Sequence, residues 1–139
     1  MDAKEALKVY FGYDSYKPGQ EEIIDSILAG KDVLAIMPTG SGKSICYQVP
    51  ALLLPGITIV ISPLISLMQD QVKALNEAGI KAGYINSSLT ESQISTVYAR
   101  ALDGAYKILY VAPERLESYE FTNFVDKVGI SMVTVDEAH

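Results

Sequence analysis

The chain has 139 residues, of which 49% are hydrophobic and 20% are charged. This composition excludes a disordered chain and a disulfide-framed miniprotein, and the length leaves room for one compact domain or part of one. Lys and Arg number 11 and Asp and Glu number 17, so the formal net charge is −6. Binding of a polyanion through bulk charge is therefore not expected, and any nucleic-acid contact must be local.

The sequence carries no sign of a membrane span, a secretory signal or a disulfide. Its longest apolar run is interrupted by Pro55 and Gly56 and falls short of the roughly 20 residues that a bilayer crossing needs. The first residues lack the basic-then-apolar order of a signal peptide, and Cys46 is the only cysteine. We therefore expect a reducing, cytoplasmic compartment.

Three helices are predicted from their apolar periodicity and their end signals. The first begins at Pro18, has Ile24 on its apolar face and ends at Gly30. The second is lined by Leu64, Met68, Val72 and Leu75, and Gly79 followed by Ile80 closes it. The third begins at a capping box formed by Thr90 and Gln93.

Short β-rich runs alternate with these helices. The predicted strands are residues 32–37, 57–62, 81–85, 107–111 and 130–135. Their spacing of about 25 residues leaves room for one helix in each crossover. Strands that are apolar nearly throughout are typical of a sheet that is buried on both sides. The sequence therefore predicts an α/β fold, a mainly parallel sheet with helices on both faces.

A phosphate-binding loop is predicted between the first strand and a helical stretch. It reads Met37-Pro38-Thr39-Gly40-Ser41-Gly42-Lys43-Ser44. Gly40 and Gly42 allow the main-chain amides to turn toward phosphate oxygens. Lys43 supplies positive charge for the β and γ phosphates, and the Ser44 hydroxyl is a ligand for Mg²⁺. The alternative is a chance Gly-Lys-Ser in a surface turn.

An acidic pair, Asp136 and Glu137, follows the last predicted strand. Ligands of open parallel sheets lie beyond the carboxyl ends of the strands, so this pair is expected to converge with the phosphate loop. Asp136 would then hold Mg²⁺, and Glu137 would polarise the attacking water as general base. Alone, such a pair is more often a helix cap.

Five ordered motifs resemble those of the RecQ-type DNA helicases, which are superfamily-two proteins with a DEAH-like box. The motifs are FGYDSYKPGQEEII, MPTGSGKSICYQVPALLL, ISPLISLMQDQV, YVAPERL and VDEAH. Met37 replaces the first glycine of the usual phosphate-loop pattern, a departure that is common in helicase-type loops. The resemblance implies a RecA-like P-loop NTPase fold, with residues 1–30 as an adenine-recognition helical element and residues 31–139 as the P-loop core. It also implies truncation after the Walker B strand, with a second RecA-like domain and its arginine fingers missing.

In this family the first motif recognises adenine. The resemblance implies that Gln20 reads the adenine edge and that Tyr13 and Lys17 flank the ring, although the family commonly has arginine at the position of Lys17. The alternative for Gln20 is a first-turn helix residue that faces water.

Two further motifs imply contacts with single-stranded DNA. The implied contact residues in these motifs are Ser62, Pro63, Ser66 and Arg115. Asn86, in the polar turn before Thr90, has a similar status. The alternatives are an ordinary strand-to-helix corner, a surface ion pair of Arg115 with Glu114 or Glu117, and a plain polar turn. His139 would couple the nucleotide state to these DNA contacts, or be a frayed terminal residue.

The expected function is that of an ATP-dependent DNA helicase that uses ATP and Mg²⁺ and unwinds duplex DNA in repair or recombination. The chain alone is expected to bind nucleotide with little hydrolysis. Its location would be nucleoid-associated in a bacterium or nuclear in a eukaryote, and the oligomeric state stays open. The alternatives are a P-loop ATPase of another class and a stand-alone nucleotide-binding module.

Overall fold

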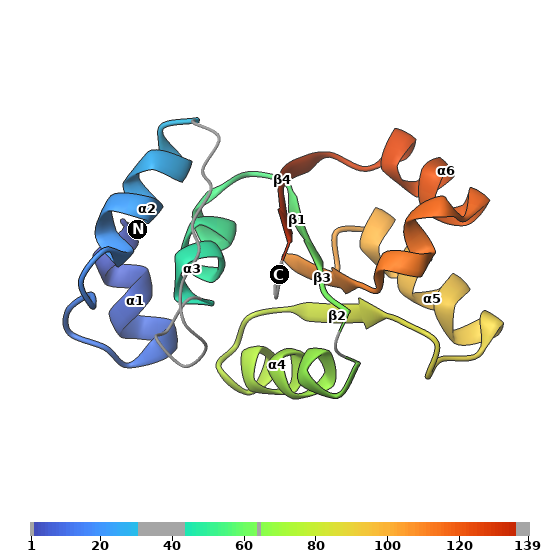
Figure 1. The fold of residues 1–139 in the computed structure, drawn as a ribbon, viewed down its shortest axis with the longest axis horizontal. Helices are drawn as coiled ribbons and strands as arrows, with labels where there is room; N and C mark the ends of the chain where they lie inside the picture. The colour runs from blue at the N-terminus through green and yellow to red at the C-terminus, as the bar shows by residue number, and fades with distance from the viewer. Residues whose placement is uncertain (1, 31–43, 64, 136–139) are drawn as a thin grey trace. The chain divides into compact units, whose positions relative to one another are not determined.

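The computed structural model describes residues 2–30, 44–63 and 65–135, which belong to two compact units, residues 1–55 and 56–139 (Figure 1). The predicted strand at 32–37 and most of the predicted phosphate loop lie outside the described residues. The same is true of residues 136–139. The proposed boundary at residues 30 and 31 therefore stays a prediction.

The described residues of the first unit form three helices, α1 (Ala3–Phe11), α2 (Gln20–Leu28) and α3 (Ile45–Leu53). Their buried apolar side chains form one cluster, whose members are Ala6, Leu7, Ile24, Ile45 and Val49. The α1 helix begins at Asp2, whose carboxylate accepts a hydrogen bond from the N–H of Glu5. Such a cap satisfies one of the main-chain donors that the first turn of a helix leaves unpaired.

The predicted start of α2 at Pro18 is wrong by two residues. Gly19 has a φ of 87°, which is in the left-handed region and cannot belong to a right-handed helix, so α2 begins at Gln20. The predicted end is confirmed, because α2 ends at Leu28 and Gly30 has a φ of 84°.

The second unit contains a parallel sheet of four strands in the order β2-β3-β1-β4. The strands are β1 (Ile57–Ile61), β2 (Ala82–Ile85), β3 (Ile108–Val111) and β4 (Ile130–Val135). Each described strand lies within one residue of its predicted bounds, and the predicted parallel sheet is confirmed. In β1 and β3 nearly every residue is buried, whereas β4 alternates, with Val133 and Val135 exposed.

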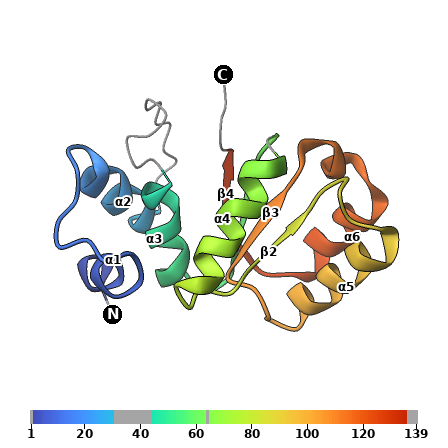
Figure 2. The ribbon, with the colours of Figure 1, turned by 90° about the horizontal axis from the view of Figure 1, so that it is seen from below.

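Helices cover both faces of this sheet, as predicted (Figure 2). One face carries α4 (Ile65–Glu77), and the other carries α5 (Glu91–Leu102) and α6 (Tyr119–Lys127). The phenol of Tyr110 donates a 2.6 Å hydrogen bond to Gln71 of α4. On the opposite face, Ile94, Tyr98 and Phe124 pack with apolar strand residues in one core cluster. A short 3₁₀ helix, η1 (Pro113–Glu117), precedes α6.

The predicted C-terminal end of α4 and the predicted start of α5 are confirmed in detail. Gly79 has a φ of 90°, and the N–H of Ile80 donates to the carbonyl of Leu75, which is the bond that terminates a helix at a left-handed residue. At the start of α5 the capping box is complete, because Thr90 and Gln93 each accept a hydrogen bond from the main chain of the other.

Candidate functional site

The parallel sheet brings the segments that follow its strands to one edge. Ser62 and Pro63 follow β1, Asn86 follows β2, and Arg115 lies in the turn of η1 that follows β3. Ser66 lies in the first turn of α4. The structure therefore gathers the five residues that the sequence predicts for nucleic-acid binding at the carboxyl edge of the sheet, and residues 136–139 follow the strand β4 of the same sheet.

These residues differ in their accessibility. Pro63 and Ser66 are exposed, whereas Ser62 is buried, and its N–H donates a 3.2 Å hydrogen bond to the carbonyl of Val111. That bond continues the β1–β3 ladder by one residue beyond the strand. Ser62 thus fixes the corner between β1 and α4.

Asn86 is fully buried, with an exposed fraction of 0%. Its side-chain oxygen accepts hydrogen bonds from both the N–H and the hydroxyl of Ser88, at 2.9 and 2.5 Å. Its amide nitrogen donates to the sulfur of Met68 at 3.3 Å. Ser88 in turn accepts a 3.1 Å hydrogen bond from the side-chain amide of Gln69. Gln69 lies in the quoted motif ISPLISLMQDQV but was not among the predicted contact residues.

Arg115 forms an ion pair with Glu91 of α5, with 3.8 Å between the charged atoms. The Arg115 side chain is 22% exposed and that of Glu91 is 75% exposed. Among the described residues the buried Nε of Arg115 has no hydrogen-bond partner. The sequence analysis anticipated a surface ion pair for Arg115 but not this partner, which is distant in the chain. This ion pair therefore connects η1, which follows β3, with the start of α5, which follows β2.

In the first unit, Gln20 is 3% exposed, so it does not face water, and that alternative is wrong. The side-chain oxygen of Gln20 accepts a 2.8 Å hydrogen bond from the main-chain N–H of Lys17. Tyr13 is 54% exposed, and Lys17 is also exposed. An oriented amide can contact the edge of a base, and an exposed aromatic ring can stack on its face.

Of the predicted phosphate loop, only Ser44 lies among the described residues. It stands at the start of α3, where the N–H of Gln48 donates to its carbonyl at 2.9 Å. Its side chain makes no capping hydrogen bond with α3. Cys46 and Tyr47, in the first turn of α3, are buried, as is typical of core positions.

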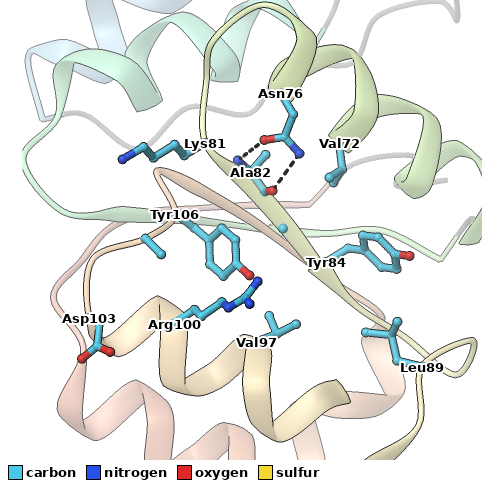
Figure 3. A pocket seen from close by; sticks show the side chains of 12 residues that line it. Val72, Asn76, Lys81, Ala82, Tyr84, Leu89, Val97, Arg100, Asp103 and Tyr106 are labelled. Carbon is cyan, nitrogen blue, oxygen red and sulfur yellow. Dashed lines mark hydrogen bonds between the residues drawn. The ribbon is translucent and has the colours of Figure 1, made fainter. Parts of the chain in front are cut away.

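A separate groove lies along β2, which is the edge strand of the sheet (Figure 3). Its volume is about 720 Å³, and Figure 3 shows Arg100 and Tyr106 projecting into it. The side chain of Asn76 accepts a hydrogen bond from the N–H of Ala82 and donates one to its carbonyl, as a neighbouring strand would. None of the predicted site residues lines this groove.

The described part of the chain lacks two features, a membrane-spanning helix and a cluster of metal-binding side chains. No helix there is long and apolar enough to span a membrane. No group of three or more His, Cys, Asp or Glu side chains there is arranged to hold a metal ion.

The chain matches one family model, several curated proteins and a solved structure. A family model described as DEAD/DEAH box helicase matches residues 17–139. The ATP-dependent DNA helicase RecQ of Pasteurella multocida (strain Pm70) is 50% identical over 137 residues, which are 99% of this chain and 22% of that protein. The protein of the same name from Bacillus subtilis (strain 168) is 51% identical over 138 residues, 99% of this chain and 23% of that protein.

A solved structure also matches. It is the crystal structure of the DUF1998 helicase MrfA bound to DNA and AMPPNP, with a TM-score of 0.76 and 20% identity over 97% of this chain and 20% of that one. At this identity the likeness shows a shared fold. The chain spans about a fifth of the length of the relatives that it matches.

Proposed function

Because the chain belongs to the DEAD/DEAH box helicase family, we propose that it is the ATP-binding part of an ATP-dependent DNA helicase that unwinds duplex DNA. The observation that carries this proposal is the identity of about 50% to RecQ helicases over 99% of the chain. The gathering of the predicted nucleic-acid residues at one edge of the sheet also supports it.

The nucleotide would be held by the phosphate loop and by the adenine-recognition residues. In this proposal Lys43 faces the β and γ phosphates, and the amides of the loop from Met37 to Ser44 surround them. Gln20 reads the adenine edge, and the hydrogen bond that it accepts from the main-chain N–H of Lys17 supports that role because it orients the amide. Tyr13 and Lys17 flank the ring.

Mg²⁺, when bound, neutralises charge on the phosphates. Ser44 and Asp136 would be its protein ligands. Glu137 would accept the proton of the attacking water. The γ-phosphate also needs positive charge from outside residues 1–139, since related phosphoryl-transfer enzymes gain about 10³ to 10⁵ in rate from an arginine finger.

The predicted contact residues at the carboxyl edge of the sheet would bind the backbone of single-stranded DNA. Hydroxyls, main-chain amides and an arginine can hold phosphates without reading bases. His139 would couple the nucleotide state to that binding. A role in repair or recombination belongs to the same proposal, as does a location with the chromosome, in the cytoplasm of a bacterium or the nucleus of a eukaryote.

The experiment that tests the nucleotide site is calorimetric titration of the 139-residue chain with ATP and Mg²⁺. Lys43→Ala should weaken binding by roughly 1.5 to 3 kcal/mol, the range for hydrogen bonds to charged groups. Lys127→Ala, which removes an equal charge from the last turn of α6, is the control and should bind as the parent chain does. Equal affinity of the Lys43 variant and the parent would overturn the site.

The catalytic assignment requires a chain extended beyond residue 139 into a second RecA-like domain. This longer protein should hydrolyse ATP in a DNA-stimulated manner, whereas the 139-residue chain should show little turnover. Glu137→Gln in the longer protein should abolish turnover and leave nucleotide binding intact. Turnover by the 139-residue chain at the rate of the longer protein would instead favour a stand-alone ATPase.

A further inference from the structure

We propose that Asn86 is a positioning residue for nucleic-acid binding and not a contact residue. This inference rests on the proposed function and refines it, because it changes how the loop after β2 would meet a phosphodiester. The loop consists of residues 86–89, between β2 and the Thr90 cap of α5.

The burial of Asn86 excludes a direct contact. Its exposed fraction is 0%, and both ends of its amide are engaged inside the protein. The oxygen already accepts two hydrogen bonds, from the N–H and the hydroxyl of Ser88, and an amide oxygen has two lone pairs. The nitrogen donates to the sulfur of Met68, on the buried side of α4.

These bonds fix the conformation of the loop. The pair of bonds to Ser88 closes a tight turn, and the N–H of Leu89 donates to the main-chain carbonyl of Asn86 at 3.2 Å. A buried polar residue that makes three hydrogen bonds in this way favours one arrangement of its neighbours. The turn is therefore set from inside the protein.

The same bonds connect the loop to α4. The Ser88 hydroxyl donates to Asn86 and accepts from the side-chain amide of Gln69, so the chain of bonds runs from a buried residue to the surface. The α4 helix follows the corner at Ser62 and Pro63, which is the other predicted DNA segment. Asn86 thus fixes the position of the loop after β2 relative to α4, and so relative to the segment after β1.

The groups that this arrangement presents are hydrogen-bond donors. Gln69 is half-buried, and its amide nitrogen has a second hydrogen beside the one given to Ser88. Ser87 is exposed, and no partner is recorded for its N–H or hydroxyl among the described residues. Neutral donors of this kind suit a phosphodiester oxygen, since they hold a backbone without selecting bases.

The test is a nuclear magnetic resonance titration of the ¹⁵N-labelled 139-residue chain with a thymidine oligonucleotide at low salt, combined with amide hydrogen exchange. Asn86→Ala should weaken oligonucleotide binding about threefold to tenfold, which corresponds to the loss of one net hydrogen bond. It should also accelerate exchange of the Ser88 amide.

A double-mutant cycle separates positioning from contact. If Asn86 acts through Ser88, the double variant Asn86→Ala/Ser88→Ala should bind no more weakly than the weaker single variant. Ser88→Ala and Gln69→Ala alter exposed or half-buried side chains and provide the same test without emptying a core position. Asn123→Ala, an exposed asparagine of α6, is the matched control and should bind as the parent does.

Additive losses in the cycle, or parental affinity in Asn86→Ala, would overturn the positioning role and leave the proposed function intact. A parent chain that binds ATP but shows no spectral change with the oligonucleotide would overturn both the DNA-binding proposal and this inference. The two failures are therefore distinguishable.

Discussion

The main-chain N–H of Lys17 donates a 2.8 Å hydrogen bond to the side-chain oxygen of Gln20. This bond spans Gly19, whose left-handed conformation turns the chain into the start of α2. The Gln20 side chain is thus oriented before a base binds, which reduces the conformational entropy that binding must remove.

Gln20 should determine base selectivity. We expect ATP to bind more tightly than GTP, and Gln20→Ala to erase this preference more than it lowers the affinity for ATP, because only the edge contact distinguishes the bases. Competition titrations with the two nucleotides measure the ratio. Gln69→Ala, a glutamine of the second unit, is the control and should keep the parental ratio. An ATP to GTP ratio in Gln20→Ala equal to that of the parent would refute the role.

Glu91 should compete with DNA phosphates for Arg115, since the two side chains form an ion pair at 3.8 Å. Glu91→Gln should therefore tighten binding of single-stranded DNA by about twofold to fivefold, as expected for a partly exposed pair worth up to about 1 kcal/mol. Fluorescence anisotropy at several salt concentrations measures this change, which should shrink as salt is raised. Glu120→Gln, in the first turn of α6, controls for the loss of one negative charge. An equal gain in both variants would show a general charge effect and not a specific competition.

Thr58 lies in the central strand β1 with an exposed fraction of 0%, and its hydroxyl has no hydrogen-bond partner among the described residues. Thr58→Val replaces that hydroxyl by a methyl group of similar size and keeps the β-branched shape. We expect the free energy of unfolding to rise by about 1 kcal/mol, because a buried hydroxyl without a partner carries a desolvation cost. Urea titration followed by circular dichroism provides the measurement. A loss of stability would mean that the hydroxyl has a partner in solution.

Cys46, the only cysteine, should react slowly with thiol reagents in the folded chain. It is 6% exposed, and burial raises the pKa of its thiol above the ordinary value, an effect that a main-chain hydrogen bond partly offsets. At pH 8 a smaller fraction is then thiolate than in the unfolded chain, and the reagent also has less access. We expect labelling to be at least about tenfold faster in urea than in buffer. Because Cys46 lies in α3, directly after the predicted phosphate loop, ATP should slow labelling of the folded chain further. Equal rates in buffer and urea would contradict the burial.

The strands could be predicted from the sequence because short β-branched runs between turn residues are a local signal. The helix ends at Gly79 and Thr90 were predictable for the same reason, since each depends on residues within one turn. The order β2-β3-β1-β4 was not predictable, because it depends on which strands pair across long stretches of chain. The α6 helix was also missed, since only Phe121, Phe124 and Val125 interrupt its polar sequence.

The candidate site shows the same division between local and distant signals. The family resemblance implied Ser62, Asn86 and Arg115 as contact residues, and the parallel strand pairing brings them to one edge of the sheet. Their contacts with DNA stay a prediction. The burial of Asn86 depends on Met68 and Ser88, and the ion pair of Arg115 depends on Glu91. These partners belong to other elements, so no local pattern reveals them. The roles of the phosphate loop and of residues 136–139 stay predictions, because these residues lie outside the described part of the chain.

The position of β1 in the sheet has a consequence for the order of folding. Thr58 pairs with Ile108 on one side and with Met132 on the other, so both partner strands follow β1 late in the chain. The next strand in sequence, β2, pairs with β3 and not with β1. During synthesis the most apolar strand of the second unit therefore emerges well before any strand that can pair with it. Pairings this distant in sequence are slow to form, so β1 passes through a period as an unpaired apolar segment, in which a nascent or refolding chain is most susceptible to aggregation.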